Sequence, residues 1–360
     1  MPEQRSVRRV LAVRVDSDGD VLLAGPALRQ LRADVDVVHL LVSPSGAAAA
    51  LLLPCVDEVV VADVPWVGAT PGRVDPATLD GLLTRLRAGR YDEAIVLTSY
   101  HQSPLPMALV AKWAGIPRVV GESDAAPGSL LDVRHRRMGS GDDPGFGGAH
   151  EVQAMCAVVE AAGHPPIGDD RLAVHRPQGT PGLAGPYVVV HPTASVPTRG
   201  IGVARAAEHA RALDADGWRV VVTGGPGEEP VGREVTPLGG VDLTGRTTLA
   251  ELAGVLAGAR AAVVGNTGPA HLAAAVGTPV VSVFAPVVPL ERWRPWGVPS
   301  VVLGDQQAAC ALSRARTCPV PGHPCTGSVS GNDVVMAVRH LAGSPSTPAG
   351  VAPRAGVGAP

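Results

Sequence analysis

The sequence has little lysine, no large surplus of either charge and no long apolar run. Lys112 is the one lysine among 360 residues, so arginine carries nearly all of the positive charge. The formal net charge of −3 gives no reason to expect a nucleic-acid partner. No apolar run approaches the roughly twenty residues that a membrane-spanning helix needs. The composition therefore argues against a nucleic-acid-binding or membrane-spanning protein.

Cysteine is also scarce. Five cysteines without a signal peptide predict a reducing compartment, the cytoplasm. Cys310, Cys318 and Cys325 lie close in sequence to His323, but their spacings of eight and seven residues differ from the paired spacing typical of zinc sites. We favour buried thiols in a packed loop, with zinc binding as the alternative.

The apolar content and its spacing predict two α/β domains. Hydrophobic residues make up 46% of the chain, as in a globular protein. Apolar strands alternate with helical segments, which predicts parallel, doubly wound sheets. A Pro- and Gly-rich stretch separates two such sets. We expect an amino-terminal domain over 1–165, a linker over 166–186, a carboxyl-terminal domain over 187–342 and a disordered tail over 343–360.

Three local patterns are less regular. The strand over 10–15 is followed by a polar turn and then by a single predicted helix over 21–31. Residues 121–149 are rich in Gly, Asp and Arg and include a basic cluster at 134–137, which predicts a long surface loop. Residues 224–229 predict a turn.

The most informative stretch runs from Ala261 to Phe284. It predicts a buried strand, a tight turn, a helix and a second buried strand. Asn266 and Thr267 are good N-cap residues, and Pro269 suits a first helical turn. Such a turn directs backbone N–H groups and the positive end of a helix toward a ligand, which suits a phosphate. An ordinary helix cap without a ligand is the alternative.

Polar residues also follow the first predicted strand. Asp16-Ser17-Asp18-Gly19-Asp20 lies where ligands bind in open α/β sheets, at the carboxyl end of a strand. Asp20 opens the following helix, where the helix dipole stabilises a carboxylate. From its position alone, a helix-capping role for Asp20 is the better interpretation.

Three further segments of the second half carry polar side chains. Thr193 and Ser195 follow a strand, and their hydroxyls can bond phosphate oxygens. A Gly-rich turn over 224–228 ends in a glutamate, which is a weak signal by itself. Residues 247 and 248 are both threonine and precede a helix, so either is a candidate N-cap.

Together these stretches resemble glycosyltransferase family 9, the ADP-heptose:lipopolysaccharide heptosyltransferases and their relatives. That family usually shows Asp-Thr-Gly, two variable residues and His-Leu-Ala-Ala-Ala. This chain has Asn266 in place of the Asp, with Thr267, Gly268 and His271 in register. The run from Asp16 to Asp20, followed by Pro-Ala-Leu-Arg, resembles the other signature of the family.

The resemblance implies an α/β fold of the GT-B type, with two Rossmann-like domains facing a cleft. It implies inverting, metal-independent transfer of a heptose-like sugar from a nucleoside diphosphate donor, with no cofactor besides that ADP-heptose-like substrate. Asp20 would be the general base, with Ser17, Asp18 and Gly19 beside the acceptor. The residues implied to bind the donor are Thr193, Ser195, Arg199, Glu228 (or Glu229 in its place), Asn266, Thr267, Gly268 and His271.

The implied partners are a nucleotide-sugar and a glycan or small-molecule acceptor, with no nucleic acid; peripheral association with a membrane is left open. Two other functions remain alternatives: a sugar-nucleotide epimerase of similar architecture, and a non-catalytic nucleotide-binding relative that has lost its base. A dehydrogenase is the least favoured, because the dinucleotide fingerprint is missing. The sequence does not predict the oligomeric state.

Overall fold

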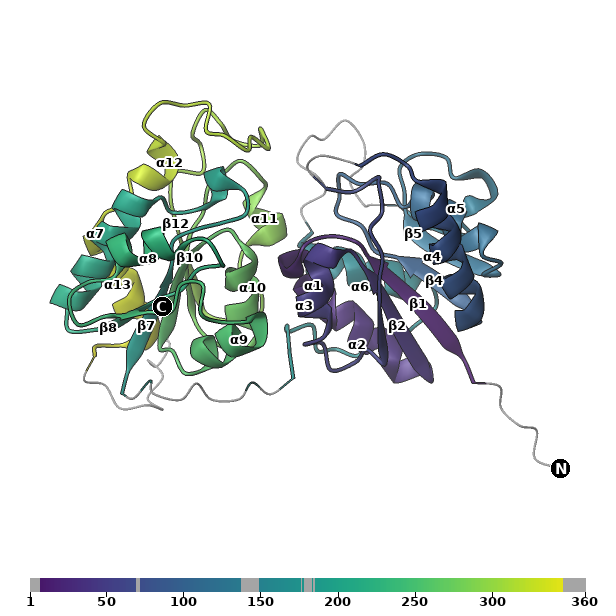
Figure 1. The fold of residues 1–360 in the computed structure, drawn as a ribbon, viewed down its shortest axis with the longest axis horizontal. Coiled ribbons are helices and arrows are strands. Elements are labelled where there is room, and N and C mark those ends of the chain that lie inside the picture. Colours follow the sequence, from purple (N-terminus) through teal and green to yellow (C-terminus); the bar gives the residue numbers. More distant parts are fainter. Residues whose placement is uncertain are drawn as a thin grey trace, which may run out of the picture. The chain divides into compact units, whose positions relative to one another are not determined.

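The computed structural model of the chain describes residues 7–68, 72–136, 149–175, 177, 183 and 185–345 (Figure 1). The chain divides into two compact units, residues 1–175 and residues 176–360. Each unit contains a parallel six-stranded sheet, so the predicted class of doubly wound α/β fold is confirmed. Residues 137–148 of the predicted surface loop and residues 346–360 of the predicted tail lie outside the described residues.

In unit 1 the strand order is β3-β2-β1-β4-β5-β6, which is the order of a Rossmann fold. The strands are β1 (Arg9–Arg14), β2 (Val37–Val42), β3 (Glu58–Val61), β4 (Glu93–Val96), β5 (Arg118–Glu122) and β6 (Val133–His135). The helices are α1 (Asp18–Leu23), α2 (Gly25–Asp34), η1 (Pro44–Gly46), α3 (Ala47–Ala50), α4 (Pro76–Gly89), α5 (Leu105–Trp113), η2 (Gly128–Leu130) and α6 (Glu151–Ala161).

Unit 2 has the same order when its sheet is read from the other edge, β9-β8-β7-β10-β11-β12. Its strands are β7 (Tyr187–His191), β8 (Arg219–Val222), β9 (Val241–Asp242), β10 (Ala261–Gly265), β11 (Val280–Val283) and β12 (Ser300–Leu303). Its helices are η3 (Pro197–Arg199), α7 (Val203–Ala215), α8 (Glu229–Val235), α9 (Leu249–Ala257), α10 (Gly268–Ala275), α11 (Leu290–Trp293), α12 (Pro324–Gly327) and α13 (Gly331–Ala342).

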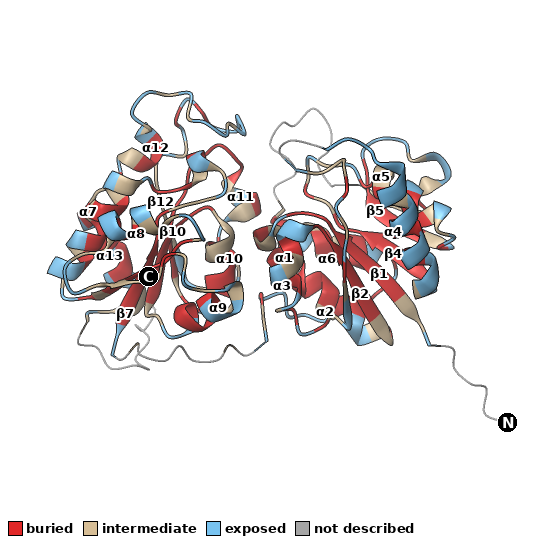
Figure 2. Ribbon diagram, viewed as in Figure 1, coloured by how far each residue is buried: buried red, intermediate tan, exposed pale blue. Residues whose placement is uncertain are grey.

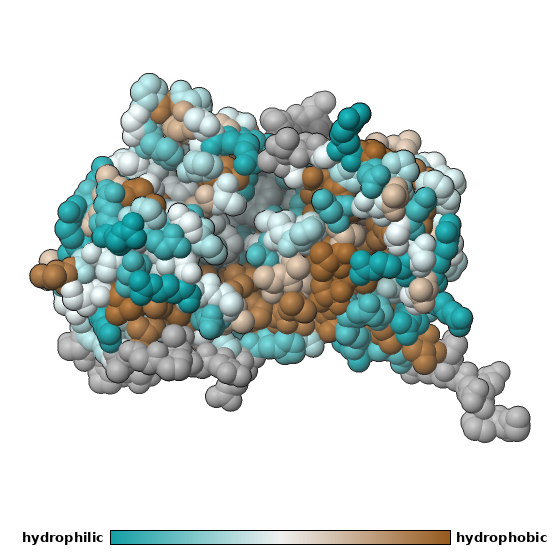
Figure 3. Space-filling model, viewed as in Figure 1, coloured by the Kyte–Doolittle hydropathy of each residue, from teal (hydrophilic) through white to brown (hydrophobic). Residues whose placement is uncertain are grey.

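The central strands of both sheets are buried on both faces, which explains why they are nearly continuous apolar runs (Figure 2). In unit 1, α4 and α5 pack together over side chains such as Leu11 and Val13 of β1. In unit 2, α7 and α13 pack over the alternate valines of β7 and β8, including Val188 and Val220. The face seen in Figure 3 carries both polar and apolar side chains, and the apolar ones gather in places.

The predicted helix over 21–31 is wrong: the structure has two helices there. α1 ends at Leu23, and α2 begins at Gly25 with Pro26 in its first turn. Proline has no N–H to donate and its ring clashes with the preceding turn, so a continuous helix cannot pass through Pro26. The chain therefore starts a new helix at the position where proline is tolerated.

One other prediction needs correction. The predicted surface loop over 121–149 contains the end of β5, the short helix η2 and the strand β6, which pairs with β5 in parallel. The structure has the predicted turn within 224–229, but this turn leads into the helix α8, which begins at Glu229 with Pro230 in its first turn and was not predicted. Because β6 and α8 are short, they lack the repeated apolar spacing that identifies an element from sequence.

The segment that follows α6 remains bound to unit 1 as far as residue 175. The fully buried imidazole of His164 contacts a carboxylate of α2 at 2.7 Å and one of β4 at 3.1 Å. Leu172 is buried, and the guanidinium of Arg29 donates to two carbonyls of the segment. The N–H of His175 donates to the carbonyl of Leu52 at 2.7 Å. This segment is therefore part of unit 1.

In a sheet of this order, ligands bind at the carboxyl ends of the strands where the order reverses. That point lies between β1 and β4 in unit 1, and between β7 and β10 in unit 2. The polar stretches singled out in the sequence follow β1, β7 and β10, so they flank these two points. Among the described residues, no helix is long and apolar enough to cross a membrane.

Candidate active site

In unit 1, a buried arginine organises the acidic residues that follow β1. Arg14 has no exposed surface, although it lies in an otherwise apolar strand. Its Nε lies 3.1 Å from Oδ2 of Asp16, and one terminal nitrogen lies 3.3 Å from Oδ1 of Asp20. The same nitrogen lies 3.9 Å from Glu151 in the first turn of α6, and it donates to Ser99 Oγ at 2.8 Å. One cation therefore faces three carboxylates.

The charges of this cluster shift one another. Burial lowers the pKa of the Arg14 guanidinium, but Asp16, Asp20 and Glu151 together raise it above its usual value. Burial raises the pKa of the Asp16 carboxyl; Arg14 opposes that rise and the charge of Asp20 adds to it. Arg14 therefore favours the ionised form of Asp16, against the effect of burial.

The three aspartates after β1 have different surroundings. Asp16 is 8% exposed, and Gln102 donates to it at 2.5 Å. Asp18 accepts the N–H of Ala49 at 2.9 Å, which ties α1 to α3. The side chain of Asp20 is 24% exposed, the largest fraction in the Arg14 cluster. Asp20 is therefore the carboxylate of this cluster best placed to reach a ligand.

Local structure holds the Asp20 carboxylate in position. Ser17 occupies the N-cap of α1, and Asp20 lies in the first turn of that helix. The Ser17 hydroxyl donates to Asp20 Oδ2 at 3.0 Å, while Arg14 lies against Oδ1. Gly19, which separates Asp18 from Asp20 in the sequence, is buried. Hydrogen bonds from a cation and a hydroxyl thus fix both carboxylate oxygens of Asp20.

In unit 2, the loops after β7 and β8 meet through a glutamate. Oε2 of Glu228 accepts the hydroxyl of Thr193 at 2.7 Å and the N–H of Gly225 at 2.7 Å. Glu229 instead accepts the N–H of Gly227 at 3.1 Å. The structure therefore brings the predicted residues Thr193 and Glu228 together. Ser195 is exposed, in the same loop as Thr193.

The loop after β7 also packs directly on the end of β10. A Cβ added to Gly265 would lie 2.1 Å from the carbonyl oxygen of Arg199, which only glycine avoids. Beneath the loop, the buried ring of His191 contacts the Thr223 hydroxyl at 3.0 Å. Burial lowers the pKa of His191 to about 4, so the ring is neutral at physiological pH.

The turn after β10 presents groups that the protein itself does not satisfy. Thr267 is the N-cap of α10, yet its hydroxyl caps none of the N–H groups of that helix. Asn266 is 7% exposed, and neither polar atom of its side chain has a hydrogen-bond partner among the described residues. Gly268 begins α10, and His271 is buried one turn into it. The predicted strand, turn and helix are confirmed.

The remaining predictions are decided only in part. Thr248, and not Thr247, is the N-cap of α9, with Glu251 completing a capping box. Cys310 and Cys325 are buried, whereas Cys318 is half-buried. Within the part of the chain that the structure describes, no group of three or more His, Cys, Asp or Glu side chains is placed to hold a metal ion. That this segment binds no metal stays a prediction.

Sequence reasoning missed four residues of the site in unit 1: Arg14, Ser99, Gln102 and Glu151. Arg14 carries the one signal that could have been used, because a charge inside an apolar strand is rare unless it has a buried partner. Ser99 and Gln102 lie on the loop that follows β4, and Glu151 lies on α6, so only the fold brings these residues to the end of β1.

Comparison with known proteins supports a single family. The model of glycosyltransferase family 9 (heptosyltransferase) matches residues 81–323. Lipopolysaccharide heptosyltransferase 1 of Pseudomonas aeruginosa is 30% identical over 331 residues, which cover 86% of this chain and 87% of that protein. Lipopolysaccharide heptosyltransferase 3 of Escherichia coli is 32% identical over 123 residues, 32% of this chain, and the match spans only 35% of that relative's length.

Solved structures agree on the fold. A family 9 glycosyltransferase from Veillonella parvula has a TM-score of 0.72 at 18% identity, covering 93% of this chain and 97% of that chain. The E. coli heptosyltransferase WaaC with ADP-2-deoxy-2-fluoro heptose has a TM-score of 0.64 at 20% identity, covering 91% and 98%. The predicted GT-B fold is therefore confirmed.

Proposed function

This chain belongs to glycosyltransferase family 9, and from that premise we propose that it transfers a heptose-like sugar from a nucleoside diphosphate to a hydroxyl group of a glycan or a small molecule. The relatives are named for heptose transfer to lipopolysaccharide, and one is solved with an ADP-heptose analogue. For this chain, the sugar, the nucleotide and the acceptor belong to the proposal.

We propose that Asp20 is the general base. The observation that carries this role is its carboxylate, which lies 3.3 Å from the Arg14 guanidinium, accepts the Ser17 hydroxyl and is still 24% exposed. Asp20 takes the proton of the acceptor hydroxyl as that oxygen attacks the anomeric carbon. The bond from this carbon to the diphosphate breaks, and the nucleoside diphosphate leaves with the electron pair. Attack from the face opposite the leaving group inverts the anomeric carbon.

The donor would be bound at the switch point of unit 2. The unpartnered amide of Asn266, the hydroxyl of Thr267 and the amino-terminal end of α10 suit a polar, anionic ligand. Arg199 would face the diphosphate, because its guanidinium fork matches phosphate oxygens. Charge that develops on the leaving group is then met by fixed donors, without a metal ion in this proposal.

The remaining donor contacts follow from the resemblance. Glu228 would hold the ribose or the base, with Thr193 and Ser195 on the phosphate side. Gly268 would allow close approach of the phosphates, and His271 would add a hydrogen bond. Ser17, Asp18 and Gly19 would line the acceptor side.

Replacement of Asp20 by asparagine tests the proposed base. Asp20→Asn keeps the size of the side chain, and its oxygen can still accept from Arg14 while its amide NH2 donates to the Ser17 hydroxyl, but it cannot take a proton. We expect turnover to fall roughly a hundredfold to ten-thousandfold, while nucleotide affinity and melting temperature stay near wild type. Asp18→Asn is the charge-matched comparison: it removes one negative charge from the same helical turn, at a carboxylate that already accepts the Ala49 N–H, and should lower turnover far less than Asp20→Asn. Near-wild-type turnover of Asp20→Asn would show that the base is another group.

A further inference from the structure

The segment between Cys310 and Cys325, to which the proposed function gives no role, is anchored firmly in unit 2. Both thiols are 1% exposed and pack with Ala285 and Val287, which follow β11. The N–H of Asp305 donates to the carbonyl of Cys325 at 3.0 Å and closes the base of the segment. The segment therefore has its own small apolar core.

The middle of this segment is held in an unusual backbone conformation. Leu312 and Arg314 have φ values of 60° and 56°, in the left-handed region that side chains other than glycine disfavour. Their N–H groups donate to the carbonyls of Pro286 and Val287, each at 2.8 Å. Such a conformation persists only where its surroundings fix it. The position of the next residue, Ala315, is therefore fixed as well.

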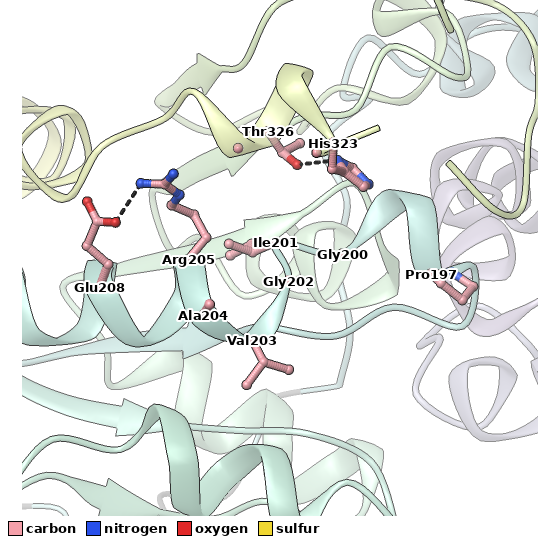
Figure 4. A pocket seen from close by; sticks show the side chains of 12 residues that line it. Pro197, Gly200, Ile201, Gly202, Val203, Ala204, Arg205, Glu208, His323 and Thr326 are labelled. Carbon is pink, nitrogen blue, oxygen red and sulfur yellow. Dashed lines mark hydrogen bonds and ion pairs between the residues drawn. The ribbon is translucent and has the colours of Figure 1, made fainter. Parts of the chain in front are cut away.

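Ala315 contacts the loop that follows β7. The hydroxyl of Thr198 donates to the carbonyl oxygen of Ala315 at 2.6 Å, and Thr198 is 2% exposed. A cavity of about 380 Å³ is lined by Pro197 and Ile201 of this loop and by His323 of the cysteine-containing segment (Figure 4). This hydrogen bond ties Thr198 to the cysteine-containing segment.

The next residue, Arg199, is restrained on its opposite side. Its carbonyl oxygen packs against the Cα of Gly265, where any side chain would collide with it. The N–H of Ile201 donates to the carbonyl of Pro192 at 2.9 Å and closes the loop. The backbone of Arg199 is thus held between Thr198 and the end of β10, next to Asn266.

We propose that Thr198 is a positioning residue for Arg199 and that the 310–325 segment is the support from which it acts. The hydroxyl of Thr198 fixes the loop to Ala315, and the loop in turn sets where the Arg199 guanidinium meets the donor diphosphate. This inference rests on the proposed donor role of Arg199. It assigns the cysteine-containing segment a mechanical role in donor binding.

Substitutions of Thr198 test this inference. Thr198→Val keeps the shape but loses the hydroxyl, and Thr198→Ser restores it. We expect calorimetry with ADP to show about five- to twentyfold weaker binding for the valine variant and near-wild-type binding for serine. Thr278→Val is the matched control. Thr278 precedes β11, is buried to a similar extent and donates its hydroxyl to the carbonyl of Leu256 at 2.7 Å.

The Arg199→Ala variant separates positioning from a general loss of structure. If Thr198 acts through Arg199, adding Thr198→Val to Arg199→Ala should weaken ADP binding no further. An additive loss, or no loss in Thr198→Val alone, would overturn the inference. Unchanged binding in Arg199→Ala would instead overturn the proposed role of that arginine in donor binding.

A second measurement needs no nucleotide. Hydrogen exchange of the full chain reports the opening of the loop over 192–201 directly. Thr198→Val should speed exchange at the Ile201 N–H at least severalfold, while Thr198→Ser and Thr278→Val leave it unchanged. Equal exchange in Thr198→Val and wild type would overturn the inference whether or not ADP is the correct nucleotide.

Discussion

Removal of the buried cation in unit 1 should have a large effect that depends on pH. Arg14→Met keeps a long side chain but leaves Asp16 and Glu151, 8% and 1% exposed, without the charge that faces them. Breaking a buried ion pair by removing one partner costs roughly 3–5 kcal/mol. We expect a loss of this size in the free energy of opening unit 1 at pH 8.

The sign of the pH dependence follows from the pKa of Asp16. Burial already raises that pKa and Arg14 opposes the rise, so Arg14→Met raises it further. A carboxyl with a raised pKa binds its proton more tightly in the folded state than in the unfolded state, so its ionisation weakens the fold as pH rises. The loss caused by Arg14→Met should therefore be smaller at pH 5 than at pH 8.

Native-state hydrogen exchange measures this loss in the intact chain. The slowest amides of β1 and β4 report unit 1, while those of β7 and β10 in unit 2 serve as an internal reference. Arg171→Met is the control, since that exposed arginine pairs only with Asp169 among the described residues. A loss below about 1 kcal/mol, or one that is equal at pH 5 and pH 8, would refute the reasoning.

Two further predictions concern unit 2. The pKa of His191 is about 4 in the folded chain, against 6.5 for an ordinary histidine. Because the unfolded chain takes up the proton first, the free energy of unfolding of unit 2 should fall by about 3 kcal/mol between pH 7 and pH 4. His191→Asn should make this acid slope shallower in urea unfolding, and an unchanged slope would contradict the assignment. Thr267→Val should weaken ADP binding about tenfold without loss of stability, because its hydroxyl caps no N–H of α10. Thr248→Val should do the opposite and lower stability by about 1 kcal/mol, since Thr248 caps α9; the reverse pattern in either variant would show that the two roles are misassigned.

Much of the fold could be predicted because its signals are local. The three valines within Tyr187–His191 predict a buried strand without distant information, and β7 has these bounds. The strand β6 has three half-buried residues, and its pairing with β5 is what defines it. A strand that depends on its neighbour in this way cannot be identified from its own residues.

The same distinction applies to the candidate site. The turn at Asn266 could be predicted because an N-cap residue and a proline mark the start of α10. The partners of Arg14 could not, because the bond to Ser99 joins residues 85 positions apart. Which aspartate is accessible also depends on such contacts, since Gln102 donates to Asp16 and the Ala49 N–H donates to Asp18.

The attachment of residues 164–175 to unit 1 has a practical consequence for dissecting the protein. A fragment that ended soon after α6 would lack the buried Leu172 and the carbonyls that accept hydrogen bonds from Arg29 of α2. A fragment extended to His175 keeps the bond to Leu52 and ends on the unit's own surface. The second cut is the natural choice for studying unit 1 in isolation.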